Sequence, residues 1–242
     1  MTATRTWATS ERIFRQLRRD PRTVAMLLVV PVLLMGLLAW ILPSHDFDQY
    51  GPLLLGLFPL LIMFLITSVT TLRERTGGTL ERLLTLPMAR ADFIFGYAIA
   101  FGCTAIIQAV LSAGLSFGAF GLQVRGSAWL VVLIAVLDAL LGTALGLFVS
   151  AFATTEFQAV QFLPLVLLPQ LILCGIIVPR EQLPTVLRWI SDLLPLSYAI
   201  DATKQVITDS VTSAFCRNIL IIAGFAAAAL IGAAATLRRR TP

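Results

Sequence analysis

The segment "PLLLGLFPLLIMFLITSVTT", residues Pro52–Thr71, contains no charged side chain. An α-helix rises about 1.5 Å per residue, so about 20 residues of this kind cross the roughly 30 Å of hydrocarbon in a bilayer. These apolar residues are continuous rather than alternating, which favours helices over the strands of a membrane barrel. Five further runs share this character: Val24–Leu42, Phe93–Phe120, Ala128–Phe152, Phe157–Val178 and Asn218–Leu237. The sequence therefore predicts an all-α membrane protein with six transmembrane helices, organised as a single domain over residues 1–242.

The composition agrees with this class. Of the 242 residues, 58% are hydrophobic and 13% are charged, whereas a soluble domain carries about 25% charged residues. The first run is longer than the core of a signal peptide and lacks a convincing cleavage site, so we expect it to be retained. Cys103, Cys174 and Cys216 are scattered and give neither a disulfide framework nor metal-ligand spacing.

The basic residues set the expected orientation. Most of the 18 arginines and lysines lie before the first run, between the second and third runs, or after the sixth. Cytoplasmic loops carry an excess of such residues, so both termini are predicted to be cytoplasmic. The net charge of +5 follows from this asymmetry and requires no nucleic-acid partner.

The piece before the first run has the periodicity of an amphipathic helix. One arc of its helical wheel is apolar and the opposite arc is basic. The apolar arc contains Trp7, Ile13, Phe14 and Leu17, and the basic arc contains Arg12, Arg15, Arg18 and Arg19. This pattern indicates a helix in the headgroup layer with its arginines toward anionic lipid. An ordinary juxtamembrane anchor is the alternative.

The segment between the fifth and sixth runs is expected to lie on the outer side. Within "LPTVLRWISDLLP", Pro184 marks a helix start and Pro195 follows the helix end. The sequence predicts a short amphipathic helix that re-enters the outer leaflet, followed by a second short helix over about Tyr198–Val206.

Motifs for nucleotide hydrolysis and metal binding are missing from the sequence. The pattern G-x-x-x-x-G-K-[ST] does not occur, and the only lysine, Lys204, follows no glycine-rich loop. The only histidine, His45, cannot build a zinc site with cysteines in separate helices. We therefore expect no cofactor and no metal in this chain.

One hydrolase pattern does occur. "GLSFG", Gly114–Gly118, matches the nucleophile elbow, but it lies inside a predicted membrane helix instead of a strand-to-helix turn. The two glycines are interpreted as helix-packing residues, and Gly142 and Gly146 repeat their spacing. An intramembrane serine protease using Ser116 and His45 is the enzymatic alternative, although His45 lies in a predicted loop, "PSHDFDQY".

Several predicted spans contain polar or helix-bending residues. Asp138 lies near the middle of the fourth run, where a carboxylate costs about 2.5–3.5 kcal/mol. It marks either a transport pathway or a hydrogen-bonded contact that locks helices together. Pro59, Pro164 and Pro169 interrupt the second and fifth runs and are expected to kink them.

Three motifs in order along the chain point to one family. "TSVTTLRERTGGTLERLLTLPMARADFIFGYAIA" resembles the signature of ABC-2-type transporter permeases. "LRRDPRTVAMLLVVPVLLM" is similar to that family's first span. "FLPLVLLPQLILCGIIVPREQLPTVLRWISDLLPLSYAIDA" is similar to its late block. One departure is Tyr97, where a lysine often follows the glycine.

The resemblance implies a coupling helix in the loop after the second span, where such permeases contact a separate ATPase subunit. Here that helix would cover Thr79–Leu86, with Gly77 and Gly78 before it. The implied coupling residues are Thr79, Leu80, Glu81, Arg82, Leu83, Leu84, Leu86 and Pro87. The leucines offer an apolar contact, and an acid in the first turn suits a helix N-terminus. Arg73, Glu74 and Arg75 are expected at the membrane boundary, in ion pairs with the N-terminal helix.

The resemblance also implies a transport function in the cytoplasmic membrane of a bacterium. The chain would pair with a second permease half, identical or paralogous, and ATP and Mg would bind the partner ATPase. The cargo would be a hydrophobic small molecule, such as a drug, antibiotic or lipid. The candidate path residues are Pro59, Phe64, Asp138, Gln161, Pro164, Pro169 and Gln170. A polysaccharide exporter is the alternative within the family. A secondary carrier is an alternative outside it.

Overall fold

The computed structural model describes residues 3–77 and 90–236. The described elements are all helical, and no strand occurs among these residues. They are α1 (Ala3–Arg19), α2 (Pro21–Ile41), α3 (Ser44–Thr76), α5 (Arg90–Gly118), α6 (Ala128–Val149), α7 (Glu156–Leu173), the 3-10 helix η1 (Arg180–Gln182), α8 (Thr185–Asp192), α9 (Pro195–Ile207) and α10 (Ser213–Thr236).

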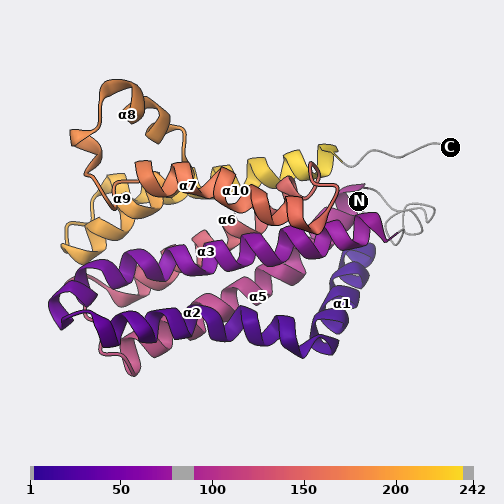
Figure 1. Cartoon of the computed structure of the whole chain (residues 1–242), viewed down its shortest axis with the longest axis horizontal. Coiled ribbons are helices and arrows are strands. Elements are labelled where there is room, and N and C mark those ends of the chain that lie inside the picture. The colour runs from indigo at the N-terminus through magenta and orange to yellow at the C-terminus, as the bar shows by residue number, and fades with distance from the viewer. Residues whose placement is uncertain (1–2, 78–89, 237–242) are drawn as a thin grey trace.

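Six of these helices are long and apolar enough to cross a membrane: α2, α3, α5, α6, α7 and α10. They run roughly parallel to one another, as Figure 1 shows, and α1 lies across one end of them. The short helices α8 and α9 lie at the opposite end. The prediction of an all-α protein with six candidate spans is confirmed.

The turn from α1 into α2 follows from its sequence. Asp20 caps α2 by accepting hydrogen bonds from the backbone N–H of Thr23 at 3.2 Å and from its hydroxyl at 2.6 Å. Both bonds favour the ionised carboxylate and lower the pKa of Asp20. Pro21 then occupies the first turn of α2, where a missing N–H is tolerated.

Some helix ends differ from the predicted ends of the spans. The helix containing the second run begins at Ser44, so the predicted loop around His45 is helical. That turn is amphipathic, with Phe47 buried at 3% exposure, and Asp46 sits favourably near the helix N-terminus. The fifth span ends at Leu173 rather than Val178. Gly175 has a φ of +92°, a conformation typical of the residue after a helix end.

The short helices match their predicted positions with small shifts. α8 begins directly after Pro184, and α9 begins at Pro195, three residues before the predicted start. α9 is not a surface helix, because Leu196, Ala199, Ala202 and Val206 along it are fully buried. α10 begins at Ser213, five residues before the predicted start of the sixth span.

The core of the bundle is the contact between α3 and α6, the most extensive pairing of elements in the fold. A Cβ added at Gly142 would overlap the carbonyl oxygen of Leu60, and one at Gly146 would lie 2.6 Å from that of Phe64. The absence of side chains at these glycines lets the two backbones touch. The packing role expected for Gly142 and Gly146 is confirmed.

Gly114 and Gly118 behave differently. No described atom lies within 4 Å of a Cβ built at either position, and both residues are exposed. Their interpretation as packing residues is therefore wrong for contacts inside the described part of this chain.

Candidate functional site

An ion pair and a hydrogen bond, both made by Arg12, join three helices beside the segment that carries the predicted coupling residues. Arg12 of α1 donates to both carboxylate oxygens of Glu74 in α3, at 3.2 and 2.9 Å. The same guanidinium donates to the hydroxyl of Tyr97 in α5 at 3.0 Å. Glu74 is the last buried residue of α3, four positions before residue 78, and Tyr97 lies eight positions after residue 89. We call Arg12, Glu74 and Tyr97 the junction cluster.

The surroundings of the junction cluster are tightly packed. Glu74 is 8% exposed and Tyr97 is fully buried. Ser10 of α1 donates to the carbonyl oxygen of Gly96 in α5 at 2.9 Å, and a Cβ at Gly96 would lie 2.6 Å from Thr9. The glycine before Tyr97 thus allows α1 to rest directly on α5. A planar guanidinium that bonds a carboxylate through two parallel N–H groups also fixes the relative orientation of its helices.

The predicted faces of α1 need one correction. Ile13 is 2% exposed, and Phe14 and Leu17 pack beside it, in agreement with an apolar face. Arg12, expected on the outward basic face with the other arginines, points to Glu74 instead. The partner of Arg12 is a carboxylate on a neighbouring helix, and the helical wheel of α1 alone does not contain that information. Trp7 is 66% exposed and so lies outside the core.

Of the three residues expected in ion pairs with α1, only Glu74 forms one among the described residues. Arg73 pairs with Glu156, the first residue of α7, through bonds of 2.7 and 2.8 Å. The side chains of Arg73 and Glu156 are both more than half exposed. Arg75 has no ion pair within residues 3–77 and 90–236, and its Nε and one terminal nitrogen are buried without a hydrogen-bond partner there. The predicted coupling residues, Thr79–Pro87, lie outside the described residues.

The seven candidate path residues separate into two groups. Pro59, Phe64, Asp138 and Gln170 are buried within the chain, whereas Gln161, Pro164 and Pro169 lie on the exposed side of α7. The Gln170 amide joins α7 to α9, since its oxygen accepts the N–H of Leu196 at 3.4 Å. The first group is therefore part of the interior of the chain, and the second group lies on its outer surface.

Asp138 lies in the contact between α3 and α6. Its Oδ2 would be 2.5 Å from a Cβ added at Gly56, and its Oδ1 is buried without a hydrogen-bond partner in the described part of the chain. Gly56 is the neighbour that sequence reasoning did not identify, because a residue without a side chain gives no chemical signal. The structure thus shows close packing at this carboxylate, and among the described residues it shows no hydrogen bond that would support the lock, one of the two roles considered for Asp138.

This packing gives a first prediction. Gly56→Ala should lower the free energy of unfolding by about 1–3 kcal/mol, the usual range for overpacking. Asp138→Ala in the same chain should recover most of that loss, because it removes the atom that the new methyl group meets. Unfolding in mixed micelles measures both changes. A double variant no more stable than Gly56→Ala alone would show that the two residues do not compete for this space.

The residues of the protease alternative do not form a catalytic pair. Ser116 is fully buried, and its hydroxyl donates to the carbonyl oxygen of Ser112 in its own helix at 2.8 Å. His45 is exposed in the first turn of α3. No hydrogen bond joins them in the described part of the chain, and the Ser116 contact is typical of a serine packed within a helix.

Sequence reasoning missed a second polar cluster, at the opposite end of the bundle. Arg180 of η1 is paired with Asp192 of α8 and Asp201 of α9. Its guanidinium also lies over the ring of Tyr198, 5.7 Å from the ring centre. The sequence offers one signal for this cluster, which is the presence of charged residues in an otherwise apolar segment.

Comparison with known proteins agrees with this architecture. The sequence model of the family described as ABC-2 type transporter matches residues 4–208. The probable multidrug ABC transporter permease YbhR of Escherichia coli K12 is 27% identical over 168 residues, which cover 69% of this chain and 46% of that protein. ABC transporter G family member 20 of Dictyostelium discoideum is 29% identical over 146 residues, covering 60% of this chain and 20% of that protein.

A third relative is the inner membrane transport permease YhhJ of Escherichia coli K12. It is 26% identical over 148 residues, which cover 61% of this chain and 40% of that protein. The chain thus spans less than half the length of each of these relatives. The family match covers most of the chain and includes all three residues of the junction cluster. This chain belongs to the ABC-2 type transporter family.

Proposed function

We propose that this chain is the membrane subunit of an ATP-driven exporter that moves hydrophobic small molecules out of the cytoplasm of a bacterium. The pattern G-x-x-x-x-G-K-[ST] does not occur in these 242 residues, and in this proposal ATP and Mg bind a partner ATPase subunit. The names of the bacterial relatives, which include a multidrug permease, support this class of cargo. The end of the bundle that carries α1 would face the cytoplasm, where its arginines are favoured.

The observation that carries the proposal is the position of the junction cluster. The segment from residue 78 to residue 89 connects α3 to α5, and the cluster ties both of these helices to α1 within a few residues of that segment. If an ATPase displaced this segment, the helices α1, α3 and α5 would therefore move together. Through the contact between α3 and α6 the displacement would also reach the centre of the bundle.

A second permease half fits the exposed surface of α7. Apolar side chains such as Phe157, Leu165 and Ile172 are exposed along this helix, together with the candidate path residues Gln161, Pro164 and Pro169. An amide on a face that met only lipid would have no hydrogen-bond partner. We propose that this face of α7 contacts the second half and lines the cargo path between the halves.

The coupling role is tested by co-purification with the ATPase. Leu83→Asp and Glu81→Arg should each abolish recovery of the ATPase with the permease, because a helix buried in a cleft does not tolerate a new charge or a reversed one. Glu181→Arg is the matched control, since it makes the same change in η1 at the opposite end of the bundle, and it should leave recovery unchanged. Full ATPase recovery and ATP-driven transport in both loop variants would refute the proposal.

A further inference from the structure

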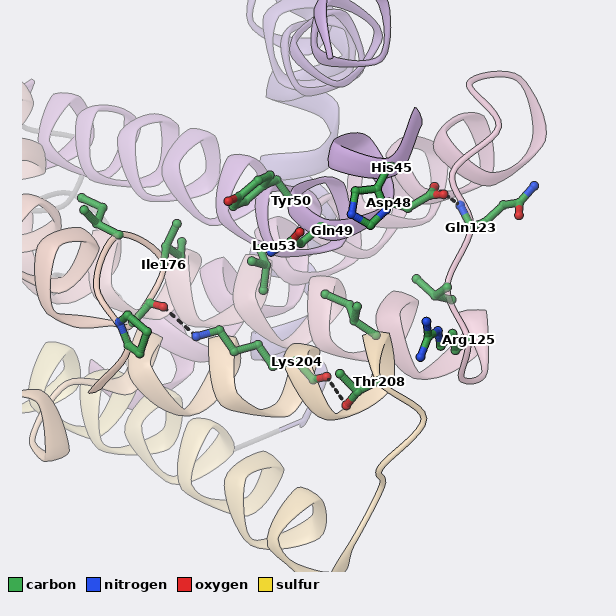
Figure 2. Close-up of a pocket in the computed structure, with 15 residues that line it drawn as sticks. His45, Asp48, Gln49, Tyr50, Leu53, Gln123, Arg125, Ile176, Lys204 and Thr208 are labelled. Atoms are coloured by element: carbon green, nitrogen blue, oxygen red, sulfur yellow. Dashed lines mark hydrogen bonds between the residues drawn. The ribbon is translucent and has the colours of Figure 1, made fainter. Parts of the chain in front are cut away.

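A cavity of about 860 Å³ opens at the end of the bundle that carries α8 and α9. Its walls come from the first turns of α3, the connection between α5 and α6, the segment after α7, and the last turns of α9. Figure 2 shows the residues that line the cavity, which come from four separate parts of the chain. The volume lies within the range of roughly 300–1,000 Å³ that is usual for small-molecule sites.

Backbone contacts hold these walls in place. The N–H of Gln123 donates to Asp48 at 2.7 Å, which fixes the α5–α6 connection to α3. The N–H of Gly126 donates to the carbonyl oxygen of Val206 at 3.0 Å, and a Cβ at Gly126 would lie 2.5 Å from that oxygen. The same connection is therefore pressed against α9. The cavity is built before any ligand arrives, which lowers the entropic cost of binding.

The wall formed by the segment after α7 depends on Lys204. Its ammonium group donates to the carbonyl oxygen of Gly175 at 2.6 Å, as Figure 2 shows. Gly175 has a positive φ, so it can turn this carbonyl toward α9 without strain. An ammonium group has three N–H donors and Gly175 uses one of them. The other donors are available to a ligand in the cavity.

The charges around the cavity favour an anion. Lys204 and Arg125 line it and form no ion pair within residues 3–77 and 90–236. The one carboxylate in the lining, Asp48, already accepts the N–H of Gln123. Asp201, one turn from Lys204 on α9, is already paired with Arg180. The lining of the cavity therefore carries a net positive charge, and Lys204 has N–H donors beyond the one that bonds Gly175.

The lining also includes polar side chains such as Gln49 and Thr208, and one part of it is apolar. Leu53 is 4% exposed, and Val124, Ile176 and Ile207 line the cavity with it. An inorganic anion would leave this surface in contact with water, whereas an attached hydrocarbon chain would cover it and gain about 0.8 kcal/mol per buried CH₂. The combination of a cationic group and an apolar wall is complementary to an amphiphile with one anionic group.

We propose that this cavity binds amphiphiles that carry a single phosphate or carboxylate, with Lys204 holding the anion and the apolar wall holding the hydrocarbon chain. The placement of the cavity on the outer face follows from the orientation proposed above. The binding chemistry itself depends only on the residues of the cavity and requires no ATPase. Its failure and the failure of the export proposal can therefore be distinguished.

The experiment exploits the single lysine of the chain. The permease alone, in nanodiscs of zwitterionic lipid, is treated with a water-soluble amine-reactive reagent, and modification of Lys204 is followed by mass spectrometry. Dodecyl phosphate and dodecanoate should each slow this modification at least fivefold. Dodecanol and inorganic phosphate at the same concentration should not slow it. Protection by dodecanol, or by inorganic phosphate alone, would overturn the proposal.

Variants then identify the residue responsible. Lys204→Gln keeps an N–H donor for Gly175 but removes the charge, so it should weaken dodecyl phosphate binding roughly tenfold to a hundredfold. Lys204→Arg should retain most of the affinity. Arg188→Gln is the matched control, because Arg188 lies on exposed α8 and outside this cavity. Equal losses in Lys204→Gln and Arg188→Gln would show that only the general surface charge matters, and would refute the assignment.

Discussion

Glu74→Ala is expected to lower the free energy of unfolding by about 3 kcal/mol and to abolish ATP-driven transport. The substitution leaves the guanidinium of Arg12 beside Tyr97 in a largely buried position with no opposing charge. Removing one member of a buried ion pair costs more than the pair contributes, because the remaining charge stays desolvated. The side chain of Arg12 is 29% exposed and that of Glu74 is 10% exposed, which places this pair nearer to the buried limit.

The chain offers a matched control for this change. Glu156→Ala removes the partner of Arg73 from the same end of the bundle, but both side chains there are more than half exposed. Solvent and salt screen such a pair, so we expect no measurable loss of stability. Unfolding in mixed micelles compares the two variants directly. Equal losses would mean that burial of the junction cluster has no energetic consequence.

A double-mutant cycle separates the ion pair from its surroundings. Arg12→Met should also destabilise the protein, since it leaves the Glu74 carboxylate buried and uncompensated. The variant with both changes should lose less than the sum of the single losses, because it contains no unpaired buried charge. Strict additivity would show that Arg12 and Glu74 act independently.

The number and type of the long helices could be predicted because one physical requirement dominates them. Each run had to be apolar over about 20 residues to cross a membrane, and all six runs appear as helices. The boundaries depended on weaker local effects. Ser44–Tyr50 reads as a polar loop, yet a single buried phenylalanine, Phe47, together with a favourably placed acid makes it helical.

The candidate site was less predictable, because its contacts join residues far apart in the sequence. Arg12 and Glu74 are 62 positions apart, and the helical wheel of α1 cannot show which neighbour its basic face meets. The same holds for Asp138, whose neighbour Gly56 has no side chain to mark it. Tyr97 was visible only as a departure from the pattern of the family, and the structure explains it as a buried hydroxyl beside Arg12.

The two G-x-x-x-G motifs are alike in sequence but differ in their packing. Each motif places two glycines on one face of a helix, so both appear equally suited to close packing. Only Gly142 and Gly146 meet another backbone among the described residues, while Gly114 and Gly118 face open space. The motif therefore identifies a surface that can be approached closely. The arrangement of the other helices decides whether it is approached within this chain.

This difference leads to the other large effect that we expect. Gly142→Ala and Gly146→Ala together should lower the free energy of unfolding by about 4 kcal/mol, since overpacking costs about 1–3 kcal/mol at each site. The new methyl groups would meet backbone atoms of Leu60 and Phe64, which cannot move away as a flexible side chain could. The helices α3 and α6 would have to separate, and their contact is the largest in the fold.

Gly114→Ala with Gly118→Ala provides the control, because it makes the same change in the same motif where no described atom lies within 4 Å. We expect this variant to be as stable as the parent, or more stable by up to about 1 kcal/mol, since alanine loses less backbone entropy than glycine in a helix. Both variants are compared by unfolding in mixed micelles. If the two pairs of substitutions had the same effect, close approach of the α3 and α6 backbones could not be what stabilises the bundle. A selective loss at Gly142 and Gly146 would identify the close approach of the α3 and α6 backbones as a main source of the stability of the bundle.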